Sequence, residues 1–479
     1  MNNRNNEYDA VVVGSGPNGL TAAIRLASKK LNVLVLEAEK TIGGGTRTKE
    51  LTEAGFKHDV CSAVHPTAVS SPYFNQLDLG KYGLEWIHPP YPFAHPLNNH
   101  ESVVVSRSLE ETATNLGIDN KAYHKLYDRF VADWGSLSED IFGPLRVPAY
   151  PLKMARFGLS GLPSASTLST RLFNSPRSRA LFAGCAAHSI LPLDKLFTSS
   201  FGIVLGASAH AVGWPIAKGG SASITDALAK LFKSLGGNIV TNKRVADIQD
   251  IPSAKAVLFD LTPQQIQKIL ADKLPSSYRS KLVDYRYGPG VFKIDFALSE
   301  AVPWKDKQLL KAGTLHLGES LEEIMRSEQN AWQGRHSDTP YVLLSQPSLF
   351  DPERAPEGKH TLWAYCHVPN GSERDMSQAI EQQIERYAPG FKDTIINKHT
   401  MNTSQLEVYN SNYIGGDING GAQMIQQLFA RPVLKWDPYS IPLKGYYICS
   451  SSTPPGGGVH GMCGYHAAAS VLKKEFGLY

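Results

Sequence analysis

The chain has 479 residues, of which 42% are hydrophobic and 19% are charged, and its formal net charge is +4. These values indicate a soluble globular protein of two or three modules and exclude disordered, fibrous and polytopic membrane proteins. Scattered Lys and Arg residues give no reason to expect a nucleic-acid partner, and five cysteines without ligand spacing give no reason to expect a metal site.

The first predicted elements are a β-strand at residues 8–13 and a helix whose apolar residues recur at helical spacing over residues 20–27. Between them, Gly14 permits a tight turn, Gly16 lets the backbone approach a pyrophosphate, and Gly19 lets the helix pack closely on the sheet. The helix N-terminus then faces the phosphates. The predicted contacts of this turn are Gly14, Gly16, Pro17, Asn18 and Gly19.

A second predicted strand, residues 32–36, ends in Glu37, eighteen residues after Gly19. A carboxylate there can accept both hydroxyl groups of an adenosine ribose and would repel a 2′-phosphate. Glu37 and its neighbour Ala38 are therefore predicted to contact the cofactor. Strand, glycine turn, helix and terminal acid together favour dinucleotide binding over an ordinary turn between a strand and a helix.

The next stretch, "AEKTIGGGTRT", favours FAD over NAD. Its three consecutive glycines open a second close approach to a ligand, and Arg47 adds a planar cation that an NAD domain does not need. The alternative is a flexible glycine loop with a surface arginine. The predicted contacts of this loop are Gly44, Gly45, Thr46 and Arg47.

Two further segments are predicted to belong to the same cofactor-binding domain. Apolar residues between positions 224 and 235 form a helical stripe, Gly236 suits the end of that helix, and residues 238–245 read as a strand returning to the sheet. Near the C-terminus, a strand at residues 446–449, the loop "SSSTPPGGGVHGMCG" and an alanine-rich helix present a second helix N-terminus. The predicted contacts of that loop are Gly457, Gly458, Val459 and His460.

The order of these motifs resembles one group of flavoproteins. They are the two-part N-terminal signature, "KGG" before the middle helix, "RVADI" after it and "PPGGGVHG" near the end. These flavoproteins are the phytoene desaturase, retinol saturase and pyridine nucleotide-disulphide oxidoreductase domain protein 2 group of the amine-oxidase-like superfamily. The resemblance covers essentially the whole chain. It implies that FAD is the cofactor, that Val245 meets the adenine through its backbone, and that the C-terminal helix dipole faces the pyrimidine edge of the flavin. One departure is that the usual small hairpin after Ile248 is missing.

The resemblance also implies the fold class. It is α/β, with an FAD-binding Rossmann-like domain built on a parallel sheet and a substrate domain of mixed or antiparallel sheet covered by helices. The expected FAD-binding domain is discontinuous and comprises residues 1–70, 212–264 and 436–479. The expected substrate domain comprises residues 71–211 and 265–435.

Two residues are predicted to take part in catalysis. Alternation along the strand expected within residues 288–304 places Val291, Lys293 and Asp295 on one face. This layout is similar to the amine-oxidase strand whose lysine holds a water at flavin N5; the alternative is a lysine on the solvent face of an edge strand. His65 follows a segment that runs beside the flavin in relatives, and it could position substrate or transfer a proton; the alternative is a packed histidine.

These features predict an FAD-dependent oxidoreductase that moves a hydride between flavin N5 and a largely apolar, isoprenoid- or lipid-like small molecule. A flavin-dependent isomerase without net redox chemistry, an amine-oxidase-like enzyme and a non-catalytic binding module stay open as alternatives. The polar N-terminus lacks the apolar core of a signal peptide, which predicts a cytoplasmic protein. For the segment "YPLKMARFGLSGL", a loop and a core-packed helix are favoured over peripheral contact with a membrane surface.

Overall fold

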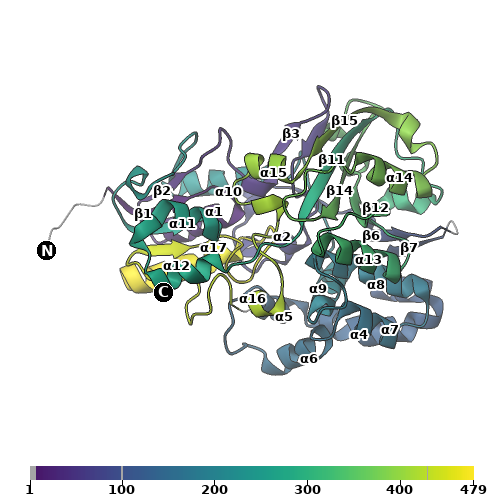
Figure 1. Ribbon diagram of the computed structural model, residues 1–479, viewed down its shortest axis with the longest axis horizontal. Helices are drawn as coiled ribbons and strands as arrows, with labels where there is room; N and C mark the ends of the chain where they lie inside the picture. The colour runs from purple at the N-terminus through teal and green to yellow at the C-terminus, as the bar shows by residue number, and fades with distance from the viewer. Residues whose placement is uncertain (1–6, 99–100, 429, 479) are drawn as a thin grey trace.

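The computed structural model describes residues 7–98, 101–428 and 430–478. In Figure 1 a five-stranded sheet with its helices lies on the left, and a seven-stranded sheet lies at the upper right above a layer of helices. The first sheet is parallel throughout and the second is mixed, so the expected α/β fold class is confirmed.

The five-stranded sheet has the order β16-β10-β1-β2-β9. Its strands are β1 (Tyr8–Val13), β2 (Val33–Leu36), β9 (Asn238–Val240), β10 (Ala254–Phe259) and β16 (Tyr446–Ile448). The sheet thus joins three distant parts of the sequence, and the exact domain limits given above stay predictions. The strand predicted at residues 238–245 ends early, because Asn242 has a φ of +55° and the next amide, that of Lys243, donates to the Glu37 carbonyl.

Helices cover both faces of this sheet, as a buried parallel sheet requires. One face packs on α1 (Pro17–Ala27), α10 (Ala222–Ser234) and α17 (Met462–Val471), and the other packs on α11 (Pro263–Leu270) and α12 (Ser276–Val283). Along β1 the side chains alternate accordingly: Ala10 and Val12 face the first group of helices, and Val11 and Val13 face the second.

The seven-stranded sheet has the order β15-β11-β14-β13-β12-β6-β7. Its strands are β6 (Tyr91–Pro96), β7 (Ser102–Val105), β11 (Gly290–Leu298), β12 (Ala312–Leu317), β13 (Val342–Ser345), β14 (His360–Val368) and β15 (Ile395–Met401). One face is apolar and packs on α14 (Ser377–Tyr387), with Phe292, Ile294 and Phe296 of β11 in that core. The other face looks toward the helical layer.

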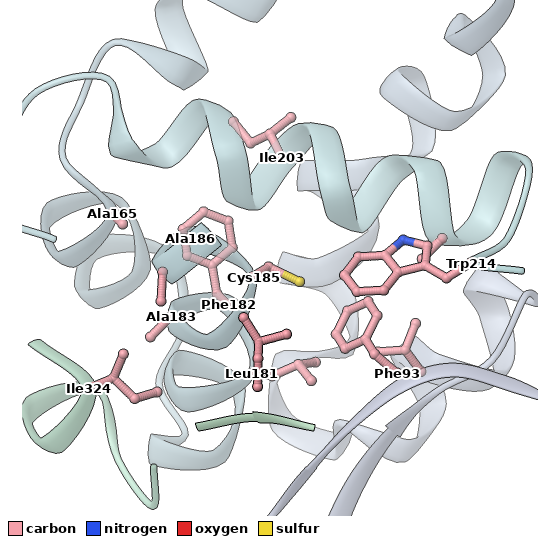
Figure 2. Packing of buried hydrophobic residues seen from close by; sticks show 14 of the residues in the cluster. Phe93, Ala165, Leu181, Phe182, Ala183, Cys185, Ala186, Ile203, Trp214 and Ile324 are labelled. Atoms are coloured by element: carbon pink, nitrogen blue, oxygen red, sulfur yellow. The ribbon is translucent and has the colours of Figure 1, made fainter. Parts of the chain in front are cut away.

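The helical layer consists of α3 (Leu109–Asn115), α4 (Asn120–Ala132), α5 (Trp134–Ile141), α6 (Pro151–Gly161), α7 (Ala165–Leu172), α8 (Pro176–Ala186), α9 (Thr198–Ala211) and α13 (Leu321–Trp332). Figure 2 shows Leu181 and Phe182 of α8 packed between Ile203 of α9 and the Phe93–Trp214 ring pair, whose centroids lie 4.7 Å apart. This core holds the helices against the sheet.

The other α-helices and strands are short. They are α2 (Pro66–Ser70), α15 (Thr403–Tyr409), α16 (Ile425–Leu428) and the strand pairs β3 (Thr48–Glu50) with β4 (Lys57–Asp59) and β5 (Trp86–Ile87) with β8 (Ile216–Ala217). Within the described ranges, every helix is too short or too polar to cross a bilayer.

Candidate active site

A cavity of about 670 Å³ runs between the two sheets and the helical layer. At one end its wall is the turn between β1 and α1, together with residues 44–47 and the C-terminal loop at residues 454–460. At the other end its wall is apolar and aromatic, with Phe157 of α6, Val204 of α9, Trp214 and Leu343 of β13. The cavity therefore joins the predicted cofactor motifs to the region expected to hold substrate.

The turn after β1 is shaped for close backbone approach. Gly14 has a φ of +105°, which is a conformation that favours glycine. A Cβ on Gly19 would lie 2.2 Å from the Gly14 carbonyl oxygen, so only glycine lets α1 pack here. Gly14, Gly16, Pro17 and Asn18 line the cavity, whereas Gly19 is buried behind them.

Glu37 and Arg47 lie together rather than contacting a ligand separately. Arg47 Nη2 is 3.3 Å from Glu37 Oε1, and both side chains are almost fully buried. The other carboxylate oxygen accepts the amide and the hydroxyl of Ser15, and Oε1 also accepts the Glu39 amide. All four lone-pair directions of the Glu37 carboxylate are thus in use, although Glu37, Ala38 and Arg47 still line the cavity.

The second glycine loop lies against the first. A Cβ on Gly44 would lie 3.1 Å from the Gly16 Cα, so the two loops pack backbone to backbone. Gly44, Gly45 and Thr46 all line the cavity, as does Val245 beyond the end of β9. The sequence motifs at residues 14–19 and 44–47 therefore meet at one wall.

The C-terminal loop brings His460 to the same cavity, together with Gly457, Gly458 and Val459. His460 Nδ1 accepts the Met462 amide at 3.0 Å at the start of α17. Burial lowers the pKa of His460 to about 4, so the ring is neutral at pH 7. Because Nδ1 accepts, the proton sits on Nε2, and His460 is a neutral hydrogen-bond donor.

The residues at this end fit a dinucleotide. The amides of Asn18, Gly44 and Gly45 find no acceptor among the residues that the structure describes, and neither does Asn18 Oδ1 find a partner there. Free amides at a helix N-terminus form an anion site that suits a pyrophosphate. These groups would hold the phosphates, and His460 and the start of α17 would face the other end of the cofactor.

Asp260, at the carboxyl end of β10, is a site residue that the sequence analysis missed. It lines the cavity, and its Oδ2 accepts the Gly19 amide at 3.0 Å. Burial raises the pKa of Asp260 from 3.8 to about 7. A single aspartate after a strand carries no motif, so only the parallel pairing of β1 with β10 reveals its place at the glycine turn.

The two predicted catalytic residues do not line the cavity. Lys293 is 2% exposed and forms an ion pair with Asp295 two residues along β11, which lies between β15 and β14. The alternative of a solvent-facing lysine on an edge strand is therefore wrong. Lys293 Nζ lies 5.9 Å from the ring centroid of Trp363, and Trp363 itself lines the cavity. The role of Lys293 at flavin N5 stays a prediction.

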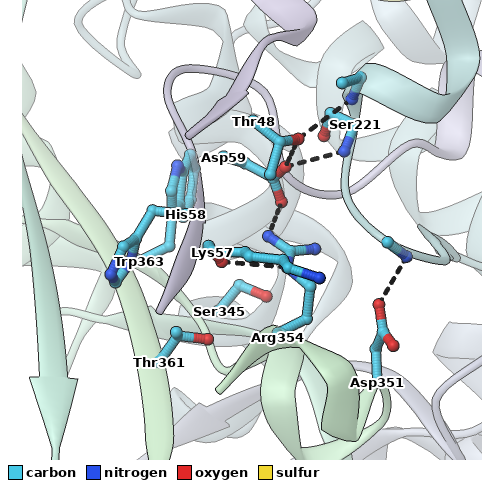
Figure 3. Close-up of polar contacts among 12 residues, drawn as sticks. Thr48, Lys57, His58, Asp59, Ser221, Ser345, Asp351, Arg354, Thr361 and Trp363 are labelled. Atoms are coloured by element: carbon cyan, nitrogen blue, oxygen red, sulfur yellow. Dashed lines mark hydrogen bonds and ion pairs between the residues drawn. The ribbon is translucent and has the colours of Figure 1, made fainter. Parts of the chain in front are cut away.

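His65 belongs to a polar network behind the cavity. Its Nε2 lies 2.8 Å from the Ser221 hydroxyl, and burial lowers the pKa of His65 to about 4. The Ser221 amide donates to Asp59, whose other oxygen pairs with Arg354 at 2.7 Å (Figure 3). In this position His65 contacts the start of α10, and a catalytic role for it stays a prediction.

Comparisons with known proteins agree with this architecture. The family model for an NAD(P)-binding Rossmann-like domain matches residues 12–77. Pyridine nucleotide-disulfide oxidoreductase domain-containing protein 2 of Rattus norvegicus is 27% identical over 98% of this chain and 94% of its own length. A lycopene-forming phytoene desaturase of a Paracoccus species is 23% identical over 97% of both chains.

A solved structure of an oxidoreductase from Methanosarcina mazei shares the fold, with a TM-score of 0.66 at 16% identity over 97% of this chain and 100% of that chain. The cavity wall built from the two glycine loops supplies the matching dinucleotide site. The chain is thus similar to dinucleotide-binding oxidoreductases, among them pyridine nucleotide-disulfide oxidoreductase domain-containing protein 2 and the phytoene desaturases, and these similarities fit the amine-oxidase-like superfamily.

Proposed function

We propose that the protein is an FAD-dependent oxidoreductase that moves a hydride between flavin N5 and a largely apolar small molecule. The observation that carries this proposal is the continuity of the cavity, which leads from the glycine loops directly to a wall of aromatic and aliphatic side chains. A mostly apolar cavity with a few placed polar groups is typical of a substrate site.

FAD, when bound, supplies the hydride acceptor or donor. The chain supplies orientation and electrostatics. The free amides of Asn18, Gly44 and Gly45 would bind its phosphates, and the Glu37–Arg47 pair fixes the two loops relative to each other. In the C-terminal loop, neutral His460 lies at the start of α17, and its donor together with the dipole of that helix would stabilise negative charge on the flavin.

An apolar substrate needs an apolar entrance, and α6 with the loop before it provides one. Leu145, Val147, Leu152 and Leu159 are each at least 67% exposed, and Leu145 also lines the cavity. Only Phe157 and Gly161 of α6 are buried, so the helix is less core-packed than its sequence suggests. We propose that this apolar entrance rests on a lipid surface from which substrate enters.

The test is anaerobic mixing of the oxidised holoprotein with candidate isoprenoids and lipids, followed by oxygen or a quinone. A substrate that bleaches the flavin absorbance, with recovery on adding the acceptor, supports the proposal. Turnover without net flavin reduction would instead favour the isomerase alternative. Reduction by primary amines in place of apolar compounds would favour an amine-oxidase-like enzyme.

A further inference from the structure

The cavity-facing side of the seven-stranded sheet carries polar side chains among apolar ones, although the sheet is buried on both sides. Two rows of side chains cross it. Neighbouring strands pair His316 with Leu343, Leu343 with Tyr365, and Tyr365 with Lys293. Trp363 lies two residues before Tyr365 in β14, and Thr314 lies two residues before His316 in β12. Both therefore share the face of that row. The opposite face carries only apolar residues on the same stretches of β11, β12 and β14.

Several of these polar groups have no partner. Thr314 is 2% exposed and lines the cavity, but its hydroxyl meets no hydrogen-bonding atom of the described residues. The Tyr365 hydroxyl also lines the cavity without a hydrogen bond inside the described ranges. Leaving a buried polar atom unpaired costs roughly 1–3 kcal/mol, so the Thr314 hydroxyl, with Tyr365 on the same cavity wall, calls for a ligand or an ordered water.

A third polar group reaches this wall from the helical layer. His188, in the turn after α8, lines the cavity, and its Nε2 lies 3.0 Å from Nε2 of His316. Burial lowers the pKa of His188 to about 3, so the two rings form a neutral pair that shares one hydrogen bond. His188 Nδ1 is a donor when His316 supplies the shared proton and an acceptor when His188 supplies it. The pair can therefore match either a carbonyl or a hydroxyl group.

We infer that the substrate is an apolar molecule bearing one oxygen function, a carbonyl or a hydroxyl, which hydrogen-bonds to the polar wall formed by His188, Thr314 and Tyr365. This inference rests on the proposed function and narrows its substrate class. His316 acts as a positioning residue, because its contact with His188 Nε2 holds the His188 ring in place and couples the tautomers of the two rings. A pure hydrocarbon would leave all three groups unpaired, and the site would reject it.

The test compares 2-undecanone, 2-undecanol and undecane as probes of the holoprotein. Trp214 and Trp363 line the cavity, so quenching of tryptophan fluorescence reports binding without any flavin chemistry. The ketone and the alcohol are expected to bind about tenfold more tightly than the alkane, as one or two buried hydrogen bonds would give. Tyr365→Phe, Thr314→Val and His188→Leu should each reduce this preference, while the affinity for undecane stays the same or increases.

Tyr341→Phe is the matched control, because its hydroxyl donates to the Gly184 carbonyl at 2.7 Å and it does not line the cavity. That variant should keep the full preference. Equal binding of the ketone and the alkane by the wild type would overturn the inference. It would indicate that ordered water, and not the substrate, binds these polar groups. A tenfold preference that survives in all three single variants would overturn it as well. If the wild type binds none of the probes, the inference and the proposed apolar substrate class are both wrong. The nucleotide bound by the purified protein tests the proposed cofactor independently.

Discussion

Arg47 Nη2 lies 3.3 Å from the Glu37 carboxylate, and this contact joins the two glycine loops of the cofactor site. Arg47 also donates to the carbonyls of Thr41 and Gly44, so its guanidinium holds the second loop in shape. The pair is therefore a structural link within the binding wall as well as a source of ligand contacts.

Glu37→Ala and Arg47→Ala should each lower FAD occupancy, because either change removes the contact that holds the second loop in place. The measurement is the ratio of flavin absorbance to protein in the purified variants. Arg279→Ala is the control, since it removes an arginine from an exposed ion pair with Asp272 away from the cavity. Wild-type occupancy in both site variants would refute this assignment.

Asp260 should make the stability of the apoprotein depend on pH. Its pKa is raised from 3.8 to about 7 in the folded state, so the folded protein holds an extra proton between these values. The contribution of Asp260 is fully present below pH 4 and is lost as the pH rises to about 7, with a total on the order of a few kcal/mol. Asp260→Asn keeps an acceptor for the Gly19 amide and should flatten the profile. Urea titrations of the wild type and Asp260→Asn between pH 5 and pH 8 measure this difference. Free energies of unfolding that change with pH in the same way in both proteins would contradict it.

The ionisation of Asp260 should also change the affinity of the protein for FAD. A protonated Asp260 beside the glycine turn does not repel a pyrophosphate, whereas an ionised one does. The dissociation constant for FAD should therefore increase above pH 7 in the wild type and stay constant in Asp260→Asn. Fluorescence titration of the apoprotein with FAD at pH 6 and pH 8.5 measures the difference.

Lys293→Met should be strongly destabilising, because it leaves Asp295 buried without its partner. Loss of one partner of a buried pair costs about 3–5 kcal/mol, and Lys293→Met/Asp295→Asn should recover most of it. If Lys293 also acts on the flavin, the double variant should bind FAD but slow flavin reduction or reoxidation by about tenfold or more. Stopped-flow traces that match the wild type in both half-reactions would leave Lys293 a purely structural role.

The apolar entrance predicts weak, reversible membrane binding. Leu152 and Leu159 lie seven residues apart on one face of α6, so Leu152→Ser/Leu159→Ser removes the contact without disturbing Phe157. Co-sedimentation with phosphatidylcholine vesicles should fall at least threefold in this variant. Val408→Ser, at another exposed apolar residue, is the control and should sediment like the wild type. Equal sedimentation of all three proteins would argue against a lipid surface.

Local sequence was enough to predict the parts of the site that depend on neighbours along the chain. The turn at residues 14–19 and the helix after it follow from glycine geometry and apolar spacing, and the alternation of β11 follows from its pattern. Contacts between distant segments could not be predicted. Gly19 meets Asp260 across 241 residues, and His65 meets Ser221 across 156 residues. The burial of Lys293 likewise depends on β15 and β14 on either side of its strand, which the pattern of β11 alone does not contain.

The cofactor itself is the central claim, and denaturing the purified protein tests it most directly. The chain should release FAD, close to one molecule per polypeptide, into the supernatant, because its Cys and His residues lie outside any recognisable attachment motif. Chromatography and mass of the released nucleotide identify it. Release of NAD or NADP without flavin, or a flavin that stays with the polypeptide, would contradict the account.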